Sequence, residues 1–176
     1  MAPTLKVGDR ILVDQSKEAR VSVKRGDVIV FKYPINPEKN FIKRVIGMEG
    51  DKVQIINGNL YLNDQIVATT RAESAPGTEQ MRTPDYDKVM FYDEQLELLR
   101  FRIQLRYNRS QKNEGPWLVP VDALFVLGDN RDNSQDSRFF GFVPRNNVEG
   151  KALKIYWSWD AASARVAWER IGQKIN

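Results

Sequence analysis

The stretch GDNRDNSQDSR, residues 128–138, is the most informative part of this 176-residue sequence. It is a dense run of small hydrogen-bonding side chains between the apolar segment 124–127 and the aromatic pair Phe139-Phe140. Buried polar groups cost free energy unless they are hydrogen-bonded, so such a run beside a core strand indicates a dedicated role. We therefore expect an ordered loop that carries functional side chains.

Outward from this loop, the composition excludes several kinds of chemistry. The sequence has no histidine and no cysteine, which excludes a Ser-His-Asp triad, an imidazole metal site, a thiol nucleophile and a disulfide. Lys, Asp, Glu and Tyr remain as general bases. The net charge of +4 is mild, and surface lysines that aid solubility explain it better than binding to nucleic acid or to anionic lipid.

The hydropathy pattern bears on the membrane. No apolar run reaches transmembrane length and no charged-then-apolar leader is present, so the chain alone is expected to be soluble. Four aromatic residues leave two interpretations open, core packing or contact with a lipid–water interface. They are Phe139, Phe140, Trp157 and Trp159.

Most of the sequence has the pattern of short strands separated by turns, which predicts an all-β barrel or sandwich. Asn57-Gly58, between two apolar runs, is a strong signal for a two-residue hairpin. From Arg100 to Asn108, apolar and polar residues alternate, and the basic side is expected to face solvent. The other expected strands are residues 10–13, 27–31 and 153–159.

Three segments have weaker patterns. Residues 72–84 are rich in small and polar residues and predict a surface loop. Residues 93–99 suggest a short helical turn. The tail from Asp160 has both helical spacing and a strand-like alternation, so its structure stays open.

Lys43 is the sharpest candidate for chemistry. In a strand it would share a face with Phe41 and Val45. Apolar neighbours desolvate an ammonium group and lower its pKa, and a lysine pKa near roughly 7–8 suits a general base. The alternative is an ordinary lysine at a solvated edge, with its stem lying on the sheet.

Several segments, in this order and over nearly the whole chain, resemble the type I signal peptidase family. Each match is weak alone, but the ordered set is very specific. The resemblance implies an all-β fold of the signal-peptidase and repressor-protease kind, with a catalytic core of residues 1–52 and 117–176 and a smaller inserted β lobe of residues 53–116. The matching segments are 1–5, 8–13, 25–34, 41–47, 50–53, 128–138 and 141–144.

By this resemblance the reaction is cleavage by a serine nucleophile with a lysine base, without metal or cofactor. Lys43 matches the general base, and Ser134 matches the serine whose hydroxyl holds the lysine ammonium in place. The resemblance also implies two supporting ion pairs, Asp129 with Arg44 and Asp136 with Arg138. An Asx-type turn without a catalytic role is the plainer interpretation of these acidic and basic residues.

The resemblance also implies the substrate and the location. Signal peptides of exported preproteins would add a strand to an exposed sheet edge, and the residues one and three before the cut would be small. The enzyme would act at the extracytoplasmic face of the bacterial inner membrane, against the membrane surface. The residues expected to line the peptide site are Met1, Ile11, Val30, Asn40 and Ile42.

One departure from the family pattern is serious. The family's nucleophile stands directly before the segment that begins at Met1, so this chain is expected to be inactive as it stands. A truncated form of an active enzyme is favoured, because Lys43 and its loop are retained. The alternatives are a non-catalytic homologue that binds peptides or assists pilus assembly, and a self-cleaving repressor, against which the inserted lobe counts.

Overall fold

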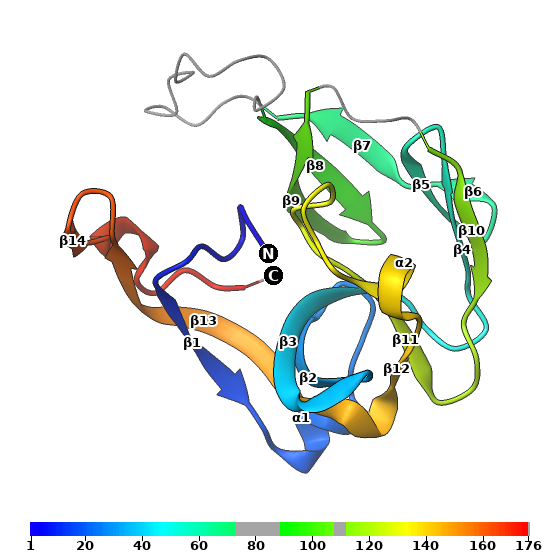
Figure 1. The fold of residues 1–176 in the computed structure, drawn as a ribbon, viewed down its shortest axis with the longest axis horizontal. Coiled ribbons are helices and arrows are strands. Elements are labelled where there is room, and N and C mark those ends of the chain that lie inside the picture. Colours follow the sequence, from blue (N-terminus) through cyan, green and yellow to red (C-terminus); the bar gives the residue numbers. More distant parts are fainter. Residues whose placement is uncertain (73–88, 108–111, 176) are drawn as a thin grey trace.

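The computed structural model describes residues 1–72, 89–107 and 112–175, and it is built almost entirely from strands (Figure 1). Within these residues, the largest sheet has seven strands, all paired antiparallel. Its order is β1 (Asp9–Asp14), β13 (Val148–Asp160), β2 (Val28–Tyr33), β3 (Asn36–Gly47), β11 (Ala123–Leu127) and β12 (Val143–Pro144), with β14 (Arg165–Val166) paired to β13.

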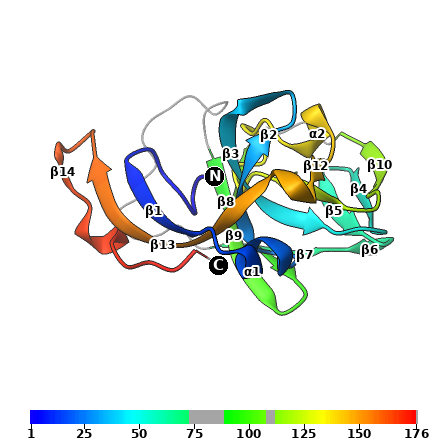
Figure 2. The same ribbon diagram turned by 90° about the horizontal axis from the view of Figure 1, so that it is seen from below.

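Two smaller antiparallel sheets lie on the side of the molecule away from β1 and β14 (Figures 1 and 2). They come from the central part of the sequence, close to the limits expected for the inserted lobe. One has the order β10 (Glu114–Leu118), β4 (Lys52–Ile56), β5 (Asn59–Leu62) and β6 (Gln65–Ile66). The other has the order β7 (Ala68–Arg71), β8 (Val89–Leu96) and β9 (Leu99–Arg106).

The helices among the described residues are short, as the all-β class predicts. They are α1 (Lys17–Val21), α2 (Ser137–Phe140), and the 3-10 helices η2 (Arg145–Asn147) and η3 (Trp168–Arg170). None of the described helices has the length and apolar character needed to cross a membrane. The polar loop ends at α2, where the Asp136 side chain caps the helix by accepting from the Arg138 N–H.

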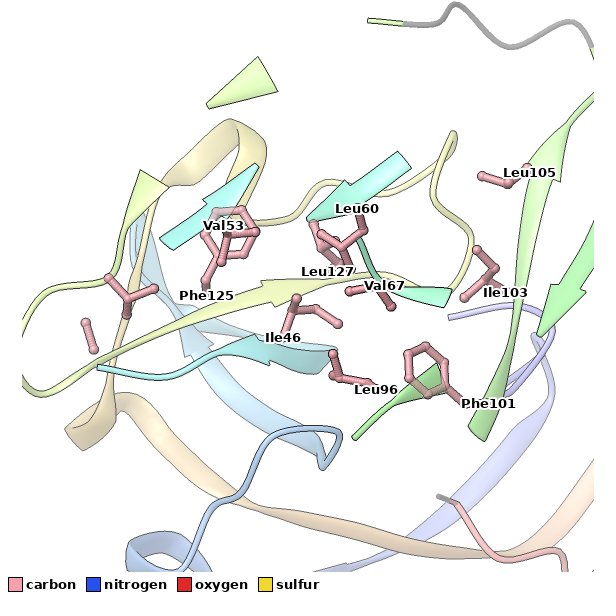
Figure 3. Close-up of a cluster of buried hydrophobic side chains, with 12 residues drawn as sticks. Ile46, Val53, Leu60, Val67, Leu96, Phe101, Ile103, Leu105, Phe125 and Leu127 are labelled. Atoms are coloured by element: carbon pink, nitrogen blue, oxygen red, sulfur yellow. The ribbon is translucent and has the colours of Figure 1, made fainter. Parts of the chain in front are cut away.

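One hydrophobic cluster joins the large sheet to the smaller ones (Figure 3). Ile46 of β3 and Leu127 of β11 pack with residues of β5, β8 and β9. The expected alternation of β9 is confirmed, because Phe101, Ile103 and Leu105 are buried while its arginines are exposed. The large sheet and the smaller sheets therefore share apolar packing.

The hairpin expected at Asn57-Gly58 is present. β4 and β5 pair antiparallel up to Ile56 and Asn59. Both turn residues have positive φ, 49° at Asn57 and 75° at Gly58. Asn and Gly are the residues that tolerate this conformation, which is why the dipeptide predicts the turn.

Two expectations are corrected by the structure. The helical turn expected at residues 93–99 is wrong, because β8 and β9 form a hairpin there. Glu94 and Leu96 are both buried, and a two-residue period places them on one face of a strand. Core packing is also wrong for three aromatic residues, since Phe139, Trp157 and Trp159 are 71%, 37% and 44% exposed.

The remaining expectations about the segments have mixed outcomes. Phe140 is partly buried against the core, unlike Phe139. The tail contains both β14 and η3, so neither pattern alone describes it. The surface loop expected at residues 72–84 lies, beyond Ala72, outside the described residues.

Candidate active site

Lys43 lies in the middle of β3, between strands β2 and β11. It pairs with Ile29 of β2, and its side chain is half-buried with Nζ 5.8 Å from the centre of the Phe41 ring. Burial lowers the pKa of the Lys43 amine below its usual value, although the negative charges of Asp136 and Asp129 act in the opposite direction. The charged form loses more hydration than these carboxylates return, so the ammonium releases its proton more readily than that of a solvated lysine.

The side chains of Ser134 and Lys43 both lie next to Gly128, the residue that follows β11. A Cβ added to Gly128 would lie 2.7 Å from Ser134 Cβ, closer still to Ser134 Oγ, and 3.6 Å from Lys43 Nζ. Among the described residues, no atom forms a hydrogen bond with the buried Ser134 Oγ. The hydroxyl is therefore free to bond a group that arrives beside the lysine.

The ion pair between Arg44 and Asp129 is fully buried at the start of the polar loop. Arg44 Nε and Nη2 donate to the two carboxylate oxygens at 2.9 and 2.8 Å, and Nη1 donates to the Gly26 carbonyl at 2.8 Å. The guanidinium also stacks on the Phe101 ring of β9, 4.1 Å from its centre. A buried bidentate pair of this kind fixes geometry as well as charge.

Asp136 organises the other end of the loop. Its carboxylate accepts from Arg138 Nε at 2.8 Å and Nη2 at 2.9 Å, and from the Gly128 N–H at 3.0 Å. Ser137 Oγ accepts from the Val126 N–H at 2.9 Å. Both ion pairs expected from the sequence are thus present. After Ser134, the loop is tied back to β11 and to Gly128 by Ser137 and Asp136.

The N-terminal segment is held against the same loop. The Thr4 hydroxyl donates to Asp129, and the Thr4 carbonyl accepts from Arg170 Nη2 at 3.0 Å. Burial, followed by the positive charge of Lys43, lowers the pKa of the Met1 α-amino group. The backbone at Met1 therefore lies within electrostatic range of Lys43.

The residues expected to line a peptide site lie on the opposite face of β2 and β3 from Lys43, or at the strand edge. Val30 pairs with Ile42 and Lys32 pairs with Asn40. Met1, Ile11 and Ile42 pack around the buried side chains of β2 and β13. Val30 is half-exposed and Asn40 is exposed. The structure therefore brings Met1, Ile11 and Ile42 together around one apolar cluster and spreads the five residues over strands β1, β2 and β3 and the N-terminal segment.

Two features of the site escaped prediction from the sequence. The rings of Tyr33 and Phe41 stack at 4.2 Å, and Gln135 Nε2 donates to the Tyr33 hydroxyl at 3.0 Å, so an aromatic group borders the lysine. Arg131 of the loop also forms a buried ion pair with Glu94 of β8. A charged residue in a polar run is a weak signal for such a pair, because its partner is distant in sequence.

Comparisons with known proteins bear on this geometry. The family described as "Signal peptidase, peptidase S26" matches residues 1–157. The chain is 36% identical to signal peptidase I of Pseudomonas aeruginosa, covering 90% of this chain and 62% of that protein. It is 38% identical to signal peptidase I of Aquifex aeolicus, covering 90% of this chain and 72% of that protein.

A solved structure of a signal peptidase I from Enterococcus faecalis is 29% identical in sequence to this chain. The match covers 74% of this chain and 96% of that chain, with a TM-score of 0.43. The chain spans about three fifths of the length of the Pseudomonas relative, 62%.

Proposed function

This chain belongs to the signal peptidase family, peptidase S26, and from that membership we propose that it supplies the base and the supporting loop of an endopeptidase that removes signal peptides from exported preproteins. The observation that carries the proposal is the half-buried amine of Lys43, whose pKa is lowered by burial, beside the unpartnered hydroxyl of Ser134. A neutral amine in such surroundings is a competent general base.

The proposed mechanism is acyl transfer through a serine that directly precedes Met1. Neutral Lys43 Nζ takes the proton of that serine hydroxyl, and the oxygen attacks the carbonyl carbon of the scissile bond. The ammonium returns the proton to the departing amine, and a water, deprotonated by the same lysine, then hydrolyses the ester. Met1 packs against the same apolar cluster as Ile42, the neighbour of Lys43 in β3, which supports this placement of the serine.

Ser134 is proposed to orient the lysine rather than to attack the substrate. Its hydroxyl lies over Gly128 beside Nζ, and the loop around it is held by the Asp129 and Asp136 ion pairs. A hydroxyl can accept from an ammonium and donate to a neutral amine. Ser134 can therefore keep Nζ in one direction through both protonation states.

The substrate is proposed to add a strand at the free edge of β3. The Val45 N–H donates to the Asp27 carbonyl, on the β2 side. Because backbone groups alternate in direction along an antiparallel strand, those of Ile42 and Asn40 face away from β2. Within the described residues β11 pairs with β3 only from Arg44 onward, so this edge is open to main-chain hydrogen bonds from an extended peptide.

The position of the enzyme at a membrane is likewise proposed. Exposed aromatic side chains of β13, Tyr156, Trp157 and Trp159, lie on the part of the large sheet away from the smaller ones (Figures 1 and 2). Tyr and Trp favour the lipid–water interface. We place this face against the extracytoplasmic side of the bacterial inner membrane, where exported preproteins emerge.

The test uses an extended enzyme, in which a serine and a preceding segment from a relative are joined to Met1. A peptide with alanine one and three positions before the cut is the substrate. Lys43→Met should lower kcat by about 10³-fold, because the base is lost. Lys39→Met, an exposed lysine of the same strand, is the matched control and should keep full activity.

Cleavage that survives Lys43→Met at the parent rate would refute the base assignment. Tight peptide binding with no cleavage by the extended enzyme would instead favour the non-catalytic, peptide-binding alternative.

A further inference from the structure

The polar loop is attached to β9 of the smaller sheets along its backbone. Asn130 forms a parallel bridge with Gln104. The Gln104 N–H donates to the Asp129 carbonyl at 2.8 Å, and the Arg131 N–H donates to the Gln104 carbonyl at 3.1 Å. The Arg106 N–H continues the contact by donating to Asp132 Oδ2 at 2.6 Å. The segment before Ser134 is therefore held against β9 by one parallel bridge and the adjoining hydrogen bonds.

A buried ion pair locks this attachment. Arg131 and Glu94 are only 8% and 2% exposed. Arg131 Nη1 donates to Glu94 Oε1 at 2.5 Å, and Nη2 donates to Oε2. The Arg131 carbonyl accepts from Arg138 Nη2 at 2.5 Å. Arg131 thus connects β8 and β9 to the Asp136–Arg138 pair of the loop that carries Ser134.

We propose that Glu94, on β8, is a positioning residue for the reaction: through Arg131 it fixes the loop so that Ser134 lies beside Lys43. The inference rests on the proposed function, since it assigns a role in that same site. It gives the smaller sheets a part in catalysis through the loop that they hold.

A buried ion pair fixes the orientation of the segments that it joins more than it increases the free energy of unfolding. Removing two charges from water costs about as much as their attraction returns, so apolar replacements of similar volume are commonly tolerated. Such replacements do not specify one direction for the loop. A displacement of about 1 Å in a catalytic group can lower the rate by about 100-fold.

The decisive variant of the extended enzyme is therefore the double substitution Glu94→Leu with Arg131→Met, which removes both charges and keeps an apolar contact. We expect it to remain folded, with kcat lowered by about 10- to 100-fold and KM nearly unchanged. The acid limb of the pH–rate profile should also move to higher pH, because a displaced loop admits water to Lys43 and relieves the desolvation of its amine.

Asp93→Asn is the matched control. Asp93 neighbours Glu94 on β8, and its ion pairs with Arg100 and Arg102 lie on the exposed side of the hairpin. This variant should keep the kcat and the pH profile of the parent.

Two results would overturn the proposal: a double variant with the kcat and acid limb of the parent, or a loss of kcat that matches the fraction of unfolded protein while the acid limb stays in place. A second measurement separates this inference from the proposed function. The pKa of Lys43, followed by NMR of its ε-carbon in the chain without added serine, should rise in the double variant. If the parent extended enzyme never cleaves, that rise would still support the positioning role, and an unchanged pKa would contradict it.

Discussion

The burial of Lys43 that suits its proposed role as a base should also destabilise the fold. Below its folded-state pKa the amine is charged in both the folded and the unfolded chain, and only the folded chain bears the desolvation cost. Lys43→Met should therefore raise Tm at pH 7 by about 2–4 °C, which corresponds to roughly 1 kcal/mol in a chain of this length. The gain should shrink as the pH rises toward the usual lysine pKa. Thermal unfolding at several pH values measures it, and a lower Tm at pH 7 would contradict the desolvation argument.

Ser134 should act on turnover more than on folding. Its Oγ has no hydrogen-bond partner among the described residues, so Ser134→Ala loses no bond and should change Tm by less than about 2 °C. Without the hydroxyl the Lys43 amine is less well oriented, and the kcat of the extended enzyme should fall by about 10- to 100-fold. Ser137→Ala is a useful comparison, because it breaks the bond to the Val126 N–H and should lower stability. Equal losses of kcat and stability in Ser134→Ala would indicate a purely structural serine.

For single residues, the sequence predicts contacts between near neighbours in the chain and does not predict contacts between residues far apart in it. The partial burial of Lys43 beside Phe41 could be predicted, because a strand places alternate residues on one face. The Glu94–Arg131 pair could not, since its partners are 37 positions apart. Glu94 resembles a surface acid until the β8–β9 hairpin packs against the loop.

The polar loop depends on the absence of a side chain at Gly128. A Cβ there would lie 2.7 Å from Ser134 Cβ, closer than side chains normally approach. Gly128→Ala should therefore displace the loop and lower the free energy of unfolding by roughly 1–3 kcal/mol. Adding Ser134→Gly removes the obstructing atoms and should recover most of that loss without recovering activity. Chemical denaturation of the parent, the two single variants and the double variant measures the coupling, and additive effects would show that the two residues do not compete for the space.

The alternation of apolar and polar residues predicted a strand where one face is apolar and the other polar. It failed where the two faces are alike. β9 was recognisable because its apolar face joins the shared cluster and its basic face meets Asp93. Residues 93–99 were misjudged because three leucines among polar residues in so short a segment fit both a helical and a two-residue period. For Trp157 and Trp159 of β13 the sequence left core packing and a lipid–water interface open, and both side chains are exposed, because aromatic residues suit either place and their pattern does not separate the two.

For the whole molecule, acid stability should depend on the contact between β1 and the C-terminal segment. Burial would raise the pKa of Asp9, but hydrogen bonds from Arg170, the Lys6 N–H and Ser158 lower it below its usual value of 3.8. A lowered carboxylate pKa stabilises the fold above the unfolded-state pKa, and the effect is lost as pH falls through the folded-state value. Asp9→Asn should therefore cost about 1–3 kcal/mol at pH 7 and progressively less below pH ~4. Denaturant titrations across this range measure the difference, and a cost independent of pH would contradict the assignment.

The contact between Arg170 and Thr4 closes a long loop of the chain. The two residues are 166 positions apart, and the same arginine binds Asp9 at the start of β1. Contacts of such long sequence separation are slow to form, because the entropy of closing the loop has to be met first. The segment that bonds Asp129 through Thr4 should therefore become ordered among the last parts of the chain during refolding.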